Sequence, residues 1–340
     1  MVHPLVERIL EGRDIPDREA FLAPSYGDRP DPFLMKDMDR AVGRALKAIA
    51  NKEKIAVWHD YDCDGVPGGA LLSDFFLAIG YPVRVHAPER ADGYGLNAKS
   101  LATLRDEGVS LVITVDCGIT DVKEVEYANA LGIDVIVTDH HLPQSELPKA
   151  YAVVNSHRAD DAYPFKGLCG TGVAFKLVEG LVARGGFPLP AGWEKWLLDL
   201  VALATVADMV PLTGENRTLV RFGLTVMRKG RRPGIRALLE AERVPFASVT
   251  EDDIAFSVAP KINAASRMAS PALALELLTT PDMSRARELA NTLISLNKDR
   301  KLEGMRVAKE VKRHIEMLPT LGDIIVTGSE SWRPSLLGIA

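Results

Sequence analysis

Short apolar runs rich in β-branched residues alternate with helical stretches from residue 54 onward. The strand candidates are residues 55–58, 83–85, 111–115, 135–138 and 153–154. Helical patterns lie between them at 69–79 and 121–131. Strand, helix, strand at this spacing is typical of βαβ units, and continuous runs such as LVITV and VIVT suit strands that are covered on both faces. The pattern predicts an α/β fold with a doubly wound, mostly parallel sheet.

The remaining sequence predicts further helices. Helical patterns cover residues 172–208 and much of 216–275. A long helix is expected from Pro281 to about Met317, with Asp282 or Ser284 as its N-cap, and a new strand follows at 323–327. The chain then divides into a helical lead-in (1–50), a main α/β domain with a helical subdomain (51–280), a connecting helix (281–318) and the start of a second α/β domain (319–340).

Composition excludes several classes of protein. The 41 Lys and Arg residues against 46 Asp and Glu residues leave a net charge of −5, which argues against a wholly basic nucleic-acid coat. Cys63, Cys117 and Cys169 form no CxxC pair, so neither a zinc ribbon nor a disulfide framework is expected. The N-terminus lacks the apolar core of a signal peptide, and the run 196–212 is too short and too acidic to span a membrane. We expect a cytoplasmic protein with no membrane partner.

Three of the predicted strands end in acidic residues or histidines. The first leads into HDYDCDG (59–65), the third into DCG (116–118) and the fourth into DHH (139–141). Ligands of an open parallel sheet bind outside the carboxyl ends of its strands, so these side chains are expected at one rim. A further acid, Asp208, ends an otherwise apolar helical stretch.

Carboxylates and imidazoles together suit Mn²⁺, and to a lesser degree Mg²⁺, Zn²⁺ or Fe²⁺. Several carboxylates in one small site repel each other unless cations neutralise them. Two divalent ions about 3.5–4 Å apart are a known arrangement for phosphoester hydrolysis. A single Asp after a strand more often caps a turn or helix, and a single His pair is more often a surface or core feature. The combination of all these residues favours a metal site.

The motifs HDYDCDG, TVDCG, TDHH and VADMVPL, in that order, resemble motifs I to IV of the DHH phosphoesterase superfamily. The stretches DPFLMKDMDRAV, RADGYGLN, YPFKGLCGTGVAFKL and APKINAASRM are similar to the RecJ-like single-stranded-DNA exonuclease family. The resemblance implies a DHH catalytic domain joined by a long helix to a DHHA1-type domain. The end of the chain, SWRPSLLGIA, resembles the beginning of that second domain and implies that the sequence stops inside it.

The resemblance also implies roles for individual residues. The implied metal ligands are Asp62, Asp64, Asp116, His140 and Asp208. Asp116 would bridge two metal ions, and Asp60 is a weaker candidate ligand. His141 would face the scissile phosphate or orient a ligand, and it completes the implied catalytic set.

Two basic segments are candidates for holding DNA. In APKINAASRM the resemblance implies that Lys261, Asn263 and Arg267 hold backbone phosphates, although Arg267 read alone could be an ordinary surface cation. The segment RKGRR is either a solvated loop or a second DNA contact, because phosphate contacts dominate such affinity. Its cations are Arg228, Lys229, Arg231 and Arg232.

Three functions remain open on the sequence. The first is a two-metal exonuclease that degrades single-stranded DNA from its 5′ end to 5′-mononucleotides, with Mn²⁺ as the preferred cofactor and Mg²⁺ as the alternative. The second is a phosphodiesterase for short oligoribonucleotides or cyclic dinucleotides, or a pyrophosphatase. The third is a non-catalytic DNA-binding relative. For the exonuclease, the resemblance implies DNA repair and recombination as its setting, with a RecQ-type helicase and a single-strand-binding protein as partners.

Overall fold

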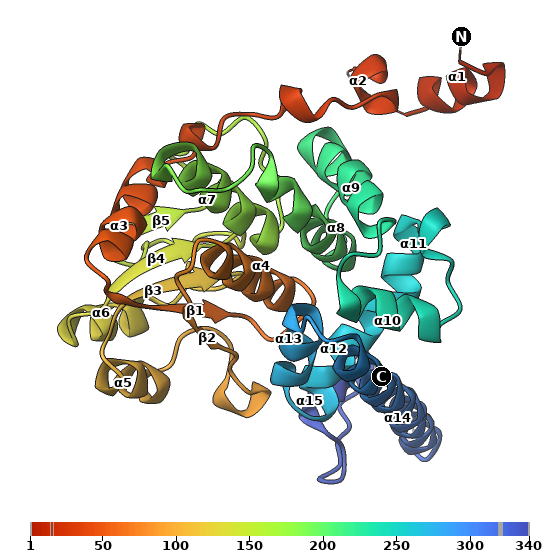
Figure 1. Cartoon of the computed structure of the whole chain (residues 1–340). Helices are drawn as coiled ribbons and strands as arrows, with labels where there is room; N and C mark the ends of the chain where they lie inside the picture. The colour runs from red at the N-terminus through yellow and green to blue at the C-terminus, as the bar shows by residue number, and fades with distance from the viewer. Residues whose placement is uncertain (1, 14, 16, 319–321, 339–340) are drawn as a thin grey trace.

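The computed structural model describes residues 2–13, 15, 17–318 and 322–338 of the chain. Its centre is a five-stranded sheet in the order β2-β1-β3-β4-β5, in which every neighbouring pair is parallel (Figure 1). The strands are β1 Lys54–His59, β2 Arg84–His86, β3 Val109–Val115, β4 Asp134–Thr138 and β5 Ala152–Val154. All five predicted strands are confirmed, and so is the parallel sheet.

Helices cover both faces of the sheet, as a doubly wound fold requires (Figure 1). One face packs against α3 (Met38–Ala50), α4 (Gly65–Ala78) and α7 (Gly170–Gly185). The other face packs against α5 (Ala98–Asp106) and α6 (Val122–Ala130). Because successive strand residues point to opposite faces, Val57 enters the first core and Trp58 the second. Burial on both faces explains why the strands are apolar throughout rather than alternating.

The chain reverses its direction of winding between β1 and β3. After β1 it crosses to β2 on one side, and from β3 onward it proceeds to β4 and β5 on the other side. Such a reversal leaves a crevice outside the carboxyl ends of the two central strands, where ligands of this fold class bind. The sequences HDYDCDG and DCG follow these two strands, so the topology directs both motifs to the crevice.

The second half of the described chain is helical. It contains α8 Leu198–Ala207, α9 Gly214–Met227, α10 Pro233–Ala241, α11 Glu251–Asp253, α12 Ala259–Met268, α13 Pro271–Thr279, α14 Met283–Glu316 and α15 Pro334–Leu337. The long helix is confirmed as α14, and the Asp282 side chain caps it by accepting a hydrogen bond from Ser284 N at 2.8 Å. The helical stretch expected at 172–208 is interrupted by a non-helical segment between Gly186 and Gly192, both of which have positive φ.

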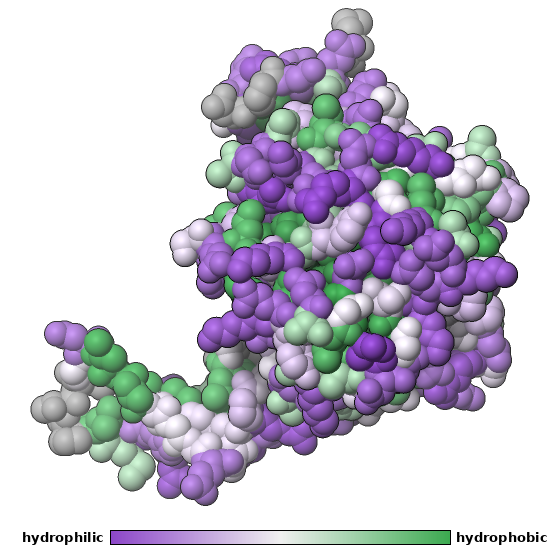
Figure 2. Space-filling model, turned by 90° about the vertical axis from the view of Figure 1, so that its left-hand side faces the viewer, coloured by the Kyte–Doolittle hydropathy of each residue, from purple (hydrophilic) through white to green (hydrophobic). Residues whose placement is uncertain are grey.

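The first and last segments of the described chain lie away from the sheet. The lead-in contains α1 Pro4–Glu11 and α2 Arg18–Leu22, which extend from the body of the molecule (Figure 1). The strand predicted at 323–327 is wrong, because the described residues there form no strand. A strand needs a neighbour for its backbone hydrogen bonds, and here Ile324 and Val326 remain 84% and 90% exposed. Figure 2 shows hydrophobic residues gathered on the projecting C-terminal part of the described chain, at the lower left.

None of the helices that the structure describes combines the length and the apolar character that a membrane span requires.

Candidate metal centre

The turn after β1 is organised by the carboxylate of Asp62. Its Oδ1 accepts hydrogen bonds from Asp64 N at 2.8 Å and from Gly65 N at 3.2 Å. Accepting these otherwise unpaired N–H groups stabilises the first turn of α4. The helix therefore begins at Gly65, four residues before the start at Gly69 that the apolar pattern predicts.

Asp116 follows β3 in an unusual backbone conformation. Its φ is 63°, in the left-handed region that Asp and Asn tolerate better than most residues. Asp116 N donates to Thr138 O at 3.0 Å, and the Tyr94 hydroxyl donates to Asp116 O at 2.8 Å. Both ends of this residue are therefore held, and its carboxylate is fixed over the carboxyl end of the sheet.

The two histidines after β4 are oriented by the buried carboxylate of Asp139. Its Oδ1 accepts from His140 N at 2.7 Å and lies 2.8 Å from Nδ1 of His141. Its Oδ2 accepts from Ile119 N at 3.0 Å. The hydrogen bond to Asp139 raises the pKa of His141 above its usual value. Asp139 thus fixes the ring of His141, whereas the ring of His140 is free to face the acids.

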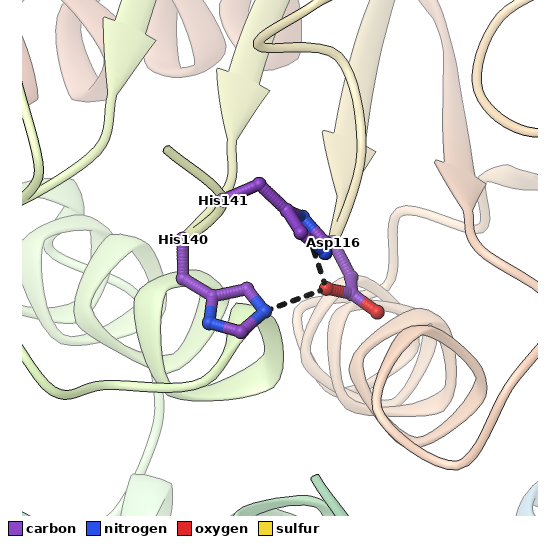
Figure 3. Close-up of side chains that lie close together, drawn as sticks. All are labelled: Asp116, His140 and His141. Atoms are coloured by element: carbon purple, nitrogen blue, oxygen red, sulfur yellow. Dashed lines mark ion pairs between the residues drawn. The ribbon is translucent and has the colours of Figure 1, made fainter. Parts of the chain in front are cut away.

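His140 Nε2 lies close to acids from three different elements. It is 3.2 Å from Asp116 Oδ1, 3.7 Å from Asp64 Oδ2 and 3.7 Å from Asp208 Oδ2. Figure 3 shows the rings of His140 and His141 both turned toward the Asp116 carboxylate. These contacts bring together residues separated by as many as 144 positions in the chain, from Asp64 to Asp208.

Three overlapping groups of potential ligand atoms result, each with its atoms within 4.8 Å of one another. The groups are Asp60, Asp62 and Asp116; Asp64, His140 and Asp208; and Asp116, His140 and His141. All seven acids and histidines predicted for the site therefore lie together, including Asp60. Asp116 belongs to two of the groups, which places it between the other two sets of ligands.

The electrostatics of the cluster indicate that it requires cations. Burial, followed by repulsion from neighbouring acids, raises the pKa of Asp60 to about 8 and that of Asp208 to about 7, and it raises the pKa of Asp116 well above its usual value. Oδ1 of Asp60 and Oδ1 of Asp116 are buried and accept no hydrogen bond within the described part of the chain. Buried carboxylate oxygens that accept no hydrogen bond are unfavourable unless a cation binds them. Carboxylate oxygens together with an imidazole nitrogen are ligands that suit divalent cations.

The first residues of α7 hold Asp64. Gly170 N donates to its Oδ2 at 2.6 Å, and Thr171 N donates to its Oδ1 at 2.8 Å. Gly170 also lies directly against Asp116, because a Cβ added to it would stand 2.5 Å from the Asp116 Cβ. Only glycine allows this helix terminus to approach both acids.

We expect Gly170→Ala to destabilise the chain by about 1–3 kcal/mol and to weaken Mn²⁺ binding, because the added methyl group displaces Asp116. Gly304→Ala in α14 is the matched control, since its Cβ would meet nothing within 4 Å and alanine favours a helix interior. Urea unfolding and calorimetric Mn²⁺ titration measure both effects. Equal metal affinity in the two variants would contradict the packing argument.

Several residues of the site were not predicted from the sequence. Asp139 stands among the predicted strand-end acids, but the sequence assigned it no role of its own. Asn155 is buried after β5, where its Nδ2 donates to His141 O at 2.9 Å and its Oδ1 accepts from His157 N at 2.8 Å. The signal for Asn155 was its place after a predicted strand, as for the acids.

His59 also supports the turn after β1. Its Nδ1 lies 2.6 Å from Asp60 O, and its ring packs so closely on α4 that a Cβ on Gly69 would overlap it. Burial lowers the pKa of His59 to about 4, so the imidazole is neutral at pH 7 and donates through Nδ1. The residue thereby holds the peptide group of Asp60.

The three residues expected to hold phosphates, Lys261, Asn263 and Arg267, differ in where their side chains lie relative to the acids. Arg267 lies near Asp62 and near two other cations, Arg90 and Arg300. Its pKa is lowered, first by burial and then by these two cations. Asn263 Oδ1 accepts from Cys63 N at 2.9 Å and so supports the ligand turn.

The structure does not bring Lys261 to the cluster. Its side chain is buried, and its Nζ pairs with Glu242 Oε2 at 2.7 Å. A lysine that is neutralised in this way cannot reach a phosphate without breaking a buried ion pair.

The DNA contact of the RKGRR segment stays a prediction, while the described residues show partners within the protein for its cations. Arg228 donates to Val249 O through Nε at 3.0 Å and through Nη2 at 2.6 Å. Lys229 and Arg231 lie over the ring of Trp196.

Arg232 is 12% exposed and pairs with Asp74 and Asp199, each at 2.8 Å. Asp74 is ten residues after Asp64 along α4, or about 15 Å at the rise of a helix. The basic segment therefore lies at the far end of α4 from the cluster.

Arg232→Ala should destabilise the chain by about 3–5 kcal/mol, because it leaves the buried Asp199 and the partly buried Asp74 without their cation. Lys229→Ala, in the same segment but exposed, should change stability by less than about 0.5 kcal/mol. Urea denaturation of both variants checks this contrast. A similar midpoint for the two would mean that the buried pair does not form.

The comparisons with known proteins agree with this fold and site. Residues 54–205 match the DHH family, N-terminal domain. The chain is 37% identical over 345 residues to the single-stranded-DNA-specific exonuclease RecJ of Bacillus subtilis, covering 99% of this chain and 42% of that protein. The crystal structure of exonuclease RecJ bound to manganese superposes with a TM-score of 0.80 at 34% identity, over 90% of this chain and 76% of that one. The crystal structure of Thermus thermophilus RecJ in complex with Mn²⁺ also gives a TM-score of 0.80, at 32% identity, over 95% of this chain and 46% of that one.

The parallel sheet, the acid and histidine cluster at its switch point and the DHH match together define the class of protein. The chain belongs to the RecJ family of DHH proteins. It spans about half the length of the curated relatives that it matches, 42% in the case of the Bacillus subtilis protein.

Proposed function

We propose that this chain carries the catalytic centre of a metal-dependent phosphodiesterase that degrades single-stranded DNA from its 5′ end to 5′-mononucleotides. The observation that carries the proposal is the overlap of three potential ligand groups through Asp116 and His140. Identity of 37% to an exonuclease of this specificity supports the substrate class.

Two divalent cations would be held by two sets of residues. Asp60, Asp62 and Asp116 form one set, and Asp64, His140 and Asp208 form the other, with Asp116 positioned to reach both. The mixed carboxylate and imidazole donors favour Mn²⁺, with Mg²⁺ as the alternative. When bound, such ions polarise the phosphate and activate water for attack on it.

The chain's own residues would position the strand. The guanidinium group of Arg267 lies near Asp62, with Arg90 and Arg300 close by, so three cations can hold phosphates beside the acids. His141 is fixed by Asp139 and half exposed, which suits it to contact the scissile phosphate. Arg90 additionally lies 4.0 Å from the centre of the Tyr61 ring, which keeps its charge at the rim of the site.

Two alternatives follow from the same site. A DHH phosphodiesterase for short oligoribonucleotides or cyclic dinucleotides would use the same ligands, but the curated relatives with 35–37% identity bear the name of a DNA exonuclease. A non-catalytic relative would not need seven clustered acids and histidines. The proposal includes a division of the chain into residues 1–50, 51–280, 281–318 and 319–340. It also includes a cytoplasmic location and a role in DNA repair. The proposed partners are a RecQ-type helicase and a single-strand-binding protein.

The test is the release of mononucleotides from 5′-phosphorylated single-stranded DNA in the presence of Mn²⁺. A strand blocked at its 5′ end, a duplex and a short oligoribonucleotide are run alongside. Digestion of the open single strand alone is the expected result. Cleavage of the oligoribonucleotide alone would favour the first alternative, and bound Mn²⁺ without cleavage of any substrate would overturn the exonuclease proposal for this chain.

A further inference from the structure

Met209 follows the ligand candidate Asp208 in a backbone conformation that lowers the stability of the fold. It is the first residue after the C-cap of α8, and its φ is 59°, in the left-handed region where glycine is usual. An L-residue there costs roughly 1 kcal/mol relative to glycine. The side chain recovers nothing by burial, because it is 88% exposed. An apolar side chain at a strained, exposed position beside the cluster points to a contact with a ligand rather than with the core.

Leu142 occupies the corresponding position after the histidine pair. It follows His141 directly and is 74% exposed. Because it precedes Pro143, its backbone is restricted to extended conformations. An exposed leucine held on a restricted backbone is also poorly explained by folding.

Both residues are tied to the same point of the site. Asp208 Oδ2 and His140 Nε2 are 3.7 Å apart. The Cα of Met209 is one peptide unit from Asp208, and that of Leu142 is two units from His140, or within about 4 and 7 Å of the respective Cα atoms. A phosphate held at the cluster would therefore place its attached sugars and bases within reach of these two side chains.

We propose that Leu142 and Met209 form an apolar contact surface for the nucleobases next to the phosphate held at the metal cluster. The inference rests on the proposed function and adds a determinant of the substrate: a strand with bases rather than a bare phosphodiester chain. Aliphatic and thioether groups contact the flat face of any base, so the contact is tolerant of sequence. Cations held by the cluster, together with Arg267, would bind the phosphate, and contact with the bases is left to the apolar pair.

The test compares two 5′-phosphorylated strands of equal length, one of thymidylate and one of base-free tetrahydrofuran units. The variants are Leu142→Ala, Met209→Asn and the double substitution; asparagine tolerates the left-handed φ, so it removes the apolar contact without straining the backbone. In the double variant we expect the ratio of kcat/KM for the thymidylate strand to that for the base-free strand to fall about tenfold. Fluorescence anisotropy with Mn²⁺ present and with non-hydrolysable linkages in both strands gives the same ratio for binding, independently of catalysis.

Leu77→Ala is the matched control, because this exposed leucine lies at the opposite end of α4. It should leave both ratios unchanged. An unchanged ratio in the double variant, or an equal loss on both strands, would overturn the inference while leaving the proposed function standing. The unsubstituted chain could fail to release nucleotides while the binding ratio is still lowered in the double variant. That result would overturn the proposed exonuclease activity and support the base contact.

Discussion

Asp116→Asn should lower the rate of nucleotide release by about a thousandfold. Asp116 is the acid shared by two of the three ligand groups, and its buried Oδ1 has no hydrogen-bond donor among the described residues. Asparagine keeps the size of the side chain and tolerates the φ of 63°, so the backbone is preserved while the negative charge is lost. Steady-state kinetics and calorimetric Mn²⁺ titration should show the loss of rate together with weaker metal binding.

The stability of this variant separates a catalytic role from a structural one. Burial raises the pKa of Asp116 well above its usual value, so the charged carboxylate is unfavourable without a cation. The Tm of the metal-free Asp116→Asn variant should therefore be no lower than that of the unsubstituted chain. Asp106→Asn is the control, because Asp106 precedes the amino end of β3, whereas the cluster lies at the carboxyl end. It should change neither rate nor Tm. Full activity of Asp116→Asn with normal metal binding would remove the basis of the proposed site.

The stabilisation of the chain by Mn²⁺ should increase as the pH rises from about 5 to 8.5. Burial raises the pKa of Asp60 to about 8 and that of Asp208 to about 7 in the folded chain, above the value of 3.8 for a free side chain. A raised folded-state pKa contributes stability that is fully present below the unfolded pKa and is lost as the pH rises through the folded pKa. The metal-free chain therefore loses stability between pH 4 and 8, while cations bind better as protons leave.

Thermal unfolding with and without Mn²⁺ across this pH range measures the effect as a difference in Tm. The double variant Asp60→Asn/Asp208→Asn is the comparison, because it lacks both titrating groups. Its metal-free Tm should depend less on pH than that of the unsubstituted chain, and Mn²⁺ should stabilise it little. If the unsubstituted metal-free chain instead gained stability relative to the double variant as the pH rose through 7 to 8, the assigned direction of these pKa shifts would be wrong.

The sheet and the ligand residues could be predicted because the relevant signals are local. An apolar run such as 111–115 is a strand wherever both of its faces are covered, and all five strand candidates were confirmed. The acids and histidines of three motifs were found because each motif follows such a strand, and parallel strands deliver their carboxyl ends to one side of the sheet. Asp208 was found because it ends an apolar helix. The beginning of α4 was missed because a side-chain cap from Asp62, rather than the apolar pattern, determines it.

The basic residues could not be assigned from the sequence, because their role depends on partners far away in the chain. Lys261 pairs with Glu242, and Arg232 pairs with Asp74, 158 positions earlier. A Lys or Arg in a polar segment has the same local signal whether it faces DNA or a buried acid. Only packing decides between the two, since a buried cation is stable only beside its counter-ion.

The sequence by itself determined the class of fold, the identity of the acids and histidines and the kind of ion they suit, because backbone periodicity and donor chemistry are properties of the residues themselves. The tertiary structure decided which of these groups meet. It joined Asp60 to the cluster, oriented His141 through Asp139, and gave Lys261, Arg228 and Arg232 partners within the protein. Distances between side chains, burial and the pKa shifts that follow from burial arise only when distant segments pack together.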